Sequence, residues 1–181
     1  ADLGAEKFFN IKCRKSGLRP KLTVIVATAQ GLKMHGGTPE NRIKESDMEG
    51  LRRGLENLGK HLDNLAGFGQ SVVVAFNKYA FDTTEEVETV EAFCRARGIS
   101  FAVNEAFTHG GAGAVKLAEA VADAVENKPS GDLKFTYDDE DDIETKLTKV
   151  ATQIYGARDV VLGEKALKKL KLIEGTPLEQ M

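Results

Sequence analysis

With 181 residues, 41% of them hydrophobic and 29% charged, the chain has the size and composition of a folded domain with one good core or two small ones. A net charge of −3 with scattered basic residues disfavours a nucleic-acid partner. The two cysteines are too few for a disulfide framework, and no apolar run approaches membrane-spanning length. We therefore expect a cytoplasmic protein without a membrane partner.

Four apolar runs are predicted as strands, and they alternate with helices along the chain. The runs occupy residues 22–27, 71–76, 99–103 and, more weakly, 133–137. The first two are continuous, which is typical of parallel strands covered on both faces. The alternation predicts an α/β fold with an open, mostly parallel sheet flanked by helices, a three-layer arrangement like that of P-loop NTPases and Rossmann-like domains.

A segment after the first strand, residues 31–45, is predicted as a long loop. Loops of this length inside a compact domain are often functional, and this one follows the carboxyl end of a strand. His35 is the candidate for a polar ligand contact in it.

The first long helix is predicted from a leucine stripe at positions 51, 55, 58, 62 and 65. Ser46 and Glu49 have the spacing of a capping box ahead of it. His61 falls on the outward side of this helix, so its side chain is expected in solvent.

Two more helices are predicted around the third strand. One begins at Asp82 or Thr83 and ends at Gly98, where glycine tolerates a left-handed conformation. The other spans residues 113–127 and is expected to bury Val115, Ala118, Val121 and Val125.

The last part of the chain is predicted to be a small helical portion. Helices are expected from Ile143 to Ile154, stopped by Gly156, and over residues 164–172. The acidic run 138–142 is interpreted as a capping region, and no metal site is predicted. We divide the chain into an α/β ligand-binding portion, residues 1–128, and a mainly helical C-terminal extension, residues 129–181.

Polar and aromatic residues follow the ends of two neighbouring predicted strands. Asn77, Tyr79 and Asp82 follow the second strand, and Phe107 and His109 follow the third. The carboxyl ends of parallel strands share one edge of the sheet, where ligands of open α/β sheets bind. Core packing explains either aromatic alone, whereas the equivalent positions of the two favour a flat ligand such as a pterin, purine or flavin ring.

A complete nucleoside triphosphate site is not predicted. The chain lacks the G-x-x-x-x-G-K-[ST] loop whose amides and lysine hold phosphates. Asn77-Lys78 is similar to the base-reading loop of GTPases, but position 80 is Ala and Asp82 comes two residues late, so a GTPase is disfavoured. The glycines at 110, 111 and 113 suit an anion contact and a tight strand-to-helix turn equally well.

An ordered set of segments nevertheless resembles one family, the formate–tetrahydrofolate ligases (formyltetrahydrofolate synthetases). The resemblance covers nearly the whole chain. Its segments are Gly4 to Arg14 with Ser16-Gly17-Leu18, Val24 to Thr28, Leu32 to Gly37, Phe68-Gly69 with Val72 to Ala75, Asp82-Thr83, Gly110-Gly111 and Ile154 to Ala157.

The resemblance implies an enzyme that formylates tetrahydrofolate to 10-formyltetrahydrofolate through formyl phosphate, with formate, ATP with Mg²⁺, and tetrahydrofolate as substrates. Tyr79 and Phe107 match the two aromatics that stack on the pterin. The family commonly has Phe and Trp there, so this chain keeps the flat faces with less area. The other implied site residues are Asn77, Asp82, Gly110 and Gly111 for the folate, and Asp2, Gly4 and Thr28 for the nucleotide.

The resemblance also implies what this chain leaves out. The family's P-loop precedes the equivalent of Ala1, so we expect an internal fragment that lacks the P-loop region and the C-terminal part, carries no catalytic residue and is inactive alone. Its partners would be the remainder of the ligase chain and, for the full-length enzyme, a homotetramer. The alternatives are a stand-alone folate- or nucleotide-binding module and an oligomerisation domain.

Overall fold

The computed structural model describes residues 4–176, which pack as two units. Residues 19–133 form unit 1, and residues 4–18 together with 134–176 form unit 2. The division of the chain into portions 1–128 and 129–181 stays a prediction.

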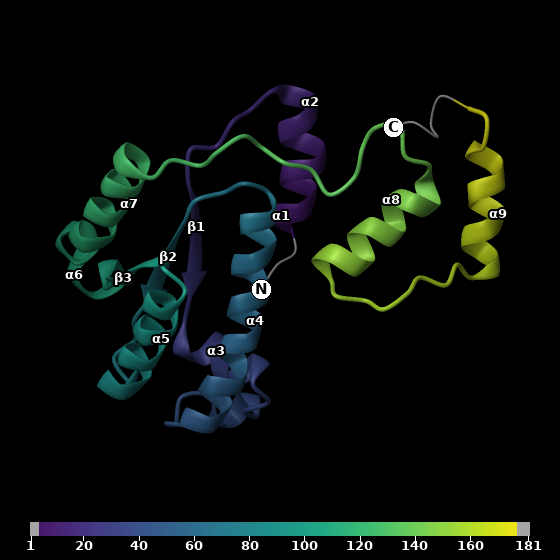
Figure 1. The fold of residues 1–181 in the computed structure, drawn as a ribbon. Coiled ribbons are helices and arrows are strands. Elements are labelled where there is room, and N and C mark those ends of the chain that lie inside the picture. Colours follow the sequence, from purple (N-terminus) through teal and green to yellow (C-terminus); the bar gives the residue numbers. More distant parts are fainter. Residues whose placement is uncertain (1–3, 177–181) are drawn as a thin grey trace. The chain divides into compact units, whose positions relative to one another are not determined.

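Unit 1 is built on a three-stranded parallel sheet in the order β1-β2-β3, as the alternating pattern predicted (Figure 1). The strands are β1 (Thr23–Ala27), β2 (Val72–Asn77) and β3 (Ser100–Asn104). The central strand β2 pairs with a neighbour along each edge and is buried from Val72 to Phe76, because helices α4 and α7 pack against it. The α/β class predicted from the sequence is confirmed.

Helices flank this sheet. α4 and α5 follow β1 and β2 in the crossovers, and α7 packs against β2 and β3 (Figure 1). The helices of unit 1 are α3 (Ala29–His35), α4 (Met48–Gly67), α5 (Thr84–Ala96), α6 (Ala106–His109) and α7 (Val115–Asn127), with 3-10 turns at Glu40–Arg42 and Gly110–Ala114.

The leucine stripe of α4 is buried as predicted, but the predicted cap is wrong. Asp47, rather than Ser46, caps the helix: its Oδ1 accepts a hydrogen bond of 2.8 Å from the Gly50 amide. Asp47 directly precedes the first helical residue in a non-helical conformation, which is the position from which a carboxylate reaches a free amide.

The predicted loop 31–45 is wrong in its first half, because α3 occupies Ala29–His35 and Thr28 caps it. α3 lies directly against α4, and this contact requires glycine. A Cβ at Gly54 would lie 1.9 Å from the Leu32 carbonyl oxygen. The tertiary contact with α4 holds a short helix that the local pattern did not indicate.

The two helices that flank β3 differ in how well they were predicted. α5 begins with a capping box between Thr83 and Glu86 and ends before Gly98, whose φ is +68°. The buried face predicted for α7 is wrong in its first half: Val115 and Ala118 are exposed, Val121 and Val125 are partly buried, and Ala124 is the buried residue. Because α7 covers β2 and β3 through a narrow stripe, its remaining positions stay open to solvent.

Unit 2 is helical. Its N-terminal helix, which the sequence did not predict, contains a π-helical segment, and a second π-helical segment follows α8. The elements are α1 (Gly4–Lys7), a π-helix at Phe8–Cys13, α2 (Arg14–Ser16), α8 (Ile143–Lys149), a π-helix at Val150–Ile154 and α9 (Glu164–Ile173).

The weak strand predicted over residues 133–137 is absent, because this segment bonds to side chains of the N-terminal helix. The Thr136 amide donates to Asn10 Oδ1 at 2.9 Å, and Asn10 Nδ2 donates to Thr136 Oγ1 at 3.0 Å. The guanidinium of Arg14 lies 4.1 Å above the centre of the Phe135 ring. Side-chain partners therefore replace the strand ladder here.

The acidic run before α8 serves as the predicted capping region. Asp142 accepts from the Thr145 amide at 2.7 Å, and Asp141 pairs with Lys149 at 2.5 Å. Across residues 4–176 no helix is both long enough and apolar enough to cross a membrane.

Candidate functional site

The ends of β2 and β3 are joined side by side at the carboxyl edge of the sheet. Asn77 and Asn104 are paired in the strand register, and Asn104 Nδ2 donates to Asn77 Oδ1 at 2.7 Å. The Lys78 amide extends the ladder by donating to the Asn104 carbonyl at 3.1 Å. The structure thus brings together the two segments that the sequence assigned to one rim.

Tyr79 sits in a closed turn directly after β2. Its amide donates to Asp82 Oδ2 at 2.8 Å, and the Asp82 amide donates to the Tyr79 carbonyl at 3.0 Å. The Tyr79 ring stacks on Phe81, with the centroids 5.5 Å apart and the planes 3° from parallel. Both rings are partly exposed, at 42% and 37%, so this pair presents an aromatic surface to solvent.

Phe81 is a candidate site residue that the sequence analysis missed. Its signal was an aromatic residue two positions after Tyr79 in the same turn. Stacking on Phe81 restricts the Tyr79 ring, and a ring that is already ordered has a smaller ordering cost when it binds a ligand.

Asp82 has one carboxylate oxygen engaged and one without a partner. The residue is buried, and its Oδ1 has no hydrogen-bond partner within the described residues. Burial, together with the nearby charge of Glu86, raises the pKa of the Asp82 carboxyl above its usual value. A buried acceptor of this kind is costly in a fold and needs an explanation, for which a functional role is one candidate.

Phe107 is the most exposed aromatic side chain of unit 1. It lies on the short helix α6 after β3, and its side chain is 99% exposed. No core packing accounts for it, so the core-packing interpretation is wrong for this residue.

A cavity of about 390 Å³ adjoins α6 and the glycine-rich turn. Its charged and polar lining comes from Glu105, His109 and Lys116, and Glu105 also pairs with Lys78 at 3.3 Å. Gly113 is required for the turn itself, because a Cβ there would lie 2.5 Å from the Glu105 carbonyl.

Gly110 and Gly111 stand at the beginning of the 3-10 turn that leads into α7. The φ of Gly110 is +57°, a conformation that favours glycine, whereas a Cβ at Gly111 would meet open space. The backbone conformation therefore explains the glycine at 110, whereas no steric contact explains the glycine at 111.

The nucleotide-binding residues expected from the resemblance are not brought together within one unit. Thr28 caps α3, its Oγ1 accepting from the Gly31 amide at 3.0 Å, and Gly4 is the first residue of α1 in unit 2. Asp2 lies outside the described residues.

Thr28 also lines a cavity of about 110 Å³ with His35 and His61. The expectation of a solvated His61 is wrong, since the ring is partly buried and burial lowers its pKa.

The segment after β1 carries a charged residue that the sequence analysis did not single out. Lys33 is fully buried on α3, and its Nζ lies 2.8 Å from Glu86 Oε1. A lysine between apolar neighbours within a helical stretch was the available signal, since a fully buried lysine requires a paired anion.

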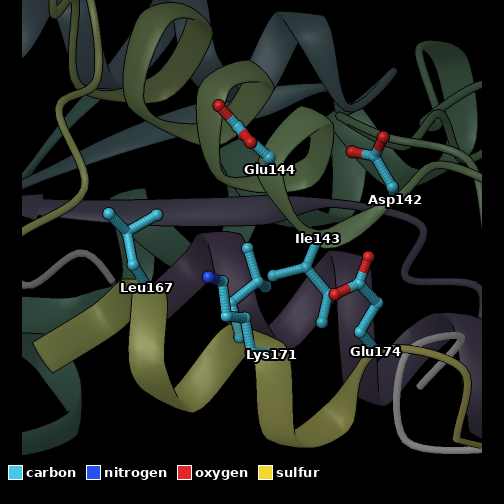
Figure 2. Close-up of a pocket in the computed structure, with 7 residues that line it drawn as sticks. Asp142, Ile143, Glu144, Leu167, Lys171 and Glu174 are labelled. Carbon is cyan, nitrogen blue, oxygen red and sulfur yellow. The ribbon is translucent and has the colours of Figure 1, made fainter. Parts of the chain in front are cut away.

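Unit 2 has a hollow of its own between α8 and α9, about 240 Å³ in volume (Figure 2). Ile143 and Leu167 contribute apolar surface, and the charged side chains of Lys171 and Glu174 lie beside them. This mixed lining is what the seam between two short amphipathic helices leaves open. Residues 4–176 contain no group of three or more His, Cys, Asp or Glu side chains that could hold a metal ion.

The fold and the rim define an α/β protein with an open parallel sheet and aromatic side chains exposed at the strand ends. The family model of formate–tetrahydrofolate ligase matches residues 1–181. The chain belongs to the formate–tetrahydrofolate ligase family.

Curated relatives support this assignment along the whole chain. A formate–tetrahydrofolate ligase of Bacteroides fragilis is 60% identical over 174 residues, covering 96% of this chain and 31% of the relative. Those of Porphyromonas gingivalis and Campylobacter concisus are 50% and 48% identical, each covering 100% of this chain and 33% of the relative. The chain therefore spans about a third of the length of these relatives.

Proposed function

We propose that this chain carries the tetrahydrofolate-stacking side of a formate–tetrahydrofolate ligase. The full-length enzyme would couple ATP cleavage to the formylation of tetrahydrofolate through formyl phosphate, giving 10-formyltetrahydrofolate. The observation that carries the proposal is a pair of exposed aromatic positions, Tyr79 and Phe107, on adjoining strand ends of a chain that belongs to this family. By itself the chain would bind the folate and catalyse nothing.

Tyr79 and Phe107 would supply the flat faces for the pterin ring, with Phe81 supporting Tyr79 from behind. Asn77 and Asp82 would shape the polar edge of the same pocket. Asn77 is paired with Asn104 at the end of β2, and Asp82 closes the turn that carries Tyr79. The turn at Gly110 and Gly111 would leave space for the rest of the ligand beside the cavity near α6.

This chain would contribute only a few residues to the nucleotide-binding site of the enzyme. Thr28 Oγ1 accepts a hydrogen bond from α3, which leaves its hydroxyl proton free for donation to a nucleotide, and Asp2 and Gly4 would stand near the adenine. Residues 4–176 contain no cluster of three or more His, Cys, Asp or Glu side chains that could hold a metal ion, and the sequence lacks a P-loop, so phosphate and metal binding would fall to other parts of the enzyme. The cytoplasmic location stays a prediction.

An assembly role is the second candidate. Val24 and Val26 on the edge strand β1 are exposed, at 40% and 61%, which suits a surface covered by further protein. The homotetramer expected for the full-length enzyme and the stand-alone binding module both stay predictions.

A titration of the ¹⁵N-labelled chain with tetrahydrofolate, followed by NMR, tests the main proposal. Saturable shifts are expected at the amides of segments 77–82 and 104–113, with ATP as the comparison ligand leaving these segments unshifted. A folded chain whose spectrum does not respond to tetrahydrofolate would contradict a preformed folate site. Formate-dependent ATP cleavage by the purified chain would contradict its assignment as an inactive part.

A further inference from the structure

Lys33 and Glu86 form an ion pair to which the proposed function assigns no role. Both side chains are fully buried, and Lys33 Nζ lies 2.8 Å from Glu86 Oε1. The same ammonium donates to the Glu45 carbonyl at 2.8 Å. Lys33 therefore ties α5 to α3 and to the segment between α3 and α4.

The geometry of Glu86 extends this tie to the beginning of α5. Its Oε2 accepts from the Thr83 amide at 2.8 Å, while Thr83 Oγ1 accepts from the Glu86 amide at 3.2 Å. One carboxylate thus holds the lysine with one oxygen and the helix cap with the other. In an ordinary exposed capping box the glutamate is free to leave; here the buried lysine fixes its orientation.

Thr83 directly follows Asp82, which closes the turn that carries Tyr79. Asp82 Oδ2 accepts from the Tyr79 amide at 2.8 Å. Hydrogen bonds and one peptide bond therefore lead without a gap from Lys33 through Glu86 and Thr83 to the Tyr79 turn.

Stability alone is a poor reason for such a pair, because well-packed apolar residues of similar size often serve a buried site equally well or better. A buried pair does hold its neighbours in one arrangement, and registry is its best-attested use. Lys33 also lies on α3, which follows β1, so it links the first strand end to the rim at the second.

We propose that Lys33 is a positioning residue for tetrahydrofolate binding: through Glu86 and the cap at Thr83 it holds the turn that presents the Tyr79 ring. This inference rests on the proposed function in the identity of the ligand. Whether Lys33 orders the Tyr79 turn does not depend on which ligand binds, and the order of the turn is measurable without ligand.

The test compares three variants of the chain. Lys33→Met removes the ammonium at similar length, and Lys33→Met/Glu86→Gln removes both charges while leaving an acceptor for the Thr83 amide. Val90→Ala is the matched control, because Val90 is fully buried on α5, the helix that carries Glu86, and takes no part in the ion pair. For each variant, urea unfolding, hydrogen exchange of the Tyr79 amide and tetrahydrofolate affinity are measured.

Lys33→Met is expected to exchange the Tyr79 amide at least about tenfold faster and to bind tetrahydrofolate about tenfold more weakly. The double variant is expected to regain stability without regaining affinity or protection. Val90→Ala is expected to lower the free energy of unfolding. Its Tyr79 amide exchange and its tetrahydrofolate affinity should stay close to those of the wild type.

Wild-type affinity and protection in the double variant would overturn the proposal, and so would an equal loss of affinity in Val90→Ala. A wild-type chain that binds no tetrahydrofolate refutes the folate assignment instead. The amide exchange, measured without ligand, then decides by itself whether Lys33 orders the turn.

Discussion

Removal of the Phe107 ring is the sharpest perturbation that the rim offers. Because this side chain is 99% exposed, Phe107→Ala removes no packing from the folded protein. We expect the free energy of unfolding to change by less than about 0.5 kcal/mol, as for other exposed positions. Any loss of affinity then reports on the ligand contact rather than on the fold.

The expected loss of affinity follows from the ring's exposure. Covering one face of a phenyl ring removes about 75 Å² from water, about 1.9 kcal/mol at 25 cal/mol per Å². Stacking adds about 0.5–1.5 kcal/mol, and ordering costs on binding subtract a similar amount. The net loss of about 1–3 kcal/mol corresponds to a dissociation constant for tetrahydrofolate raised about 5- to 150-fold.

Isothermal titration calorimetry beside urea unfolding measures both quantities on the same samples. Leu172→Ala, which removes a side chain 78% exposed in unit 2, is the matched control and should change neither. Phe107→Trp enlarges the flat face and should tighten binding. Unchanged tetrahydrofolate affinity in Phe107→Ala would refute the stacking role, and a parallel loss of stability would refute the premise that the ring is unpacked.

Three further predictions concern the fold around the site. Gly54→Ala should destabilise the chain by about 1–3 kcal/mol in urea unfolding despite the better helix propensity of alanine, because a Cβ meets a backbone oxygen of α3 at 1.9 Å; an unchanged midpoint contradicts the close approach. Burial raises the pKa of the Asp82 carboxyl in the folded state. The carboxyl therefore stabilises the fold most when the pH is below its pKa in the unfolded chain, near 3.8. This contribution is lost as the pH rises through its pKa in the folded state. Asp82→Asn should therefore gain stability relative to wild type from about pH 3 to about pH 7, and a constant difference in unfolding free energy would argue against the shift. The thiol of Cys94, whose pKa burial raises to about 11, should react with a thiol reagent at about pH 8 only after unfolding, and rapid labelling of the native chain would show that it is accessible.

Local patterns accounted for the elements whose signals are strongest. The continuous run before Asn77 predicted a buried parallel strand, and β2 is buried on both faces. The sequence placed the beginning of α5 at Asp82 or Thr83, and Thr83 is its cap. Gly98 marked its end, since only glycine enters the left-handed region freely.

Patterns failed where a distant partner decided the structure. Residues 133–137 have strand-like composition, but Asn10 takes up the amide of Thr136, so no strand forms. α3 is too short to be stable alone and exists against α4. The rim residues Tyr79 and Phe107 were found from the sequence, whereas the Phe81 stack required the turn geometry.

By itself the sequence determined the α/β class, the family and the two aromatic positions at the strand ends, because these depend on the order of residues along the chain. Only the tertiary structure decided that Phe107 is bare, that Tyr79 rests on Phe81 and that Lys33 reaches Glu86 across 53 positions of the sequence. Burial and ion pairing are properties of neighbours in space. From the sequence alone a lysine is expected at the surface. Only the folded structure shows that Lys33 is surrounded by protein and that the carboxylate of Glu86 balances its charge.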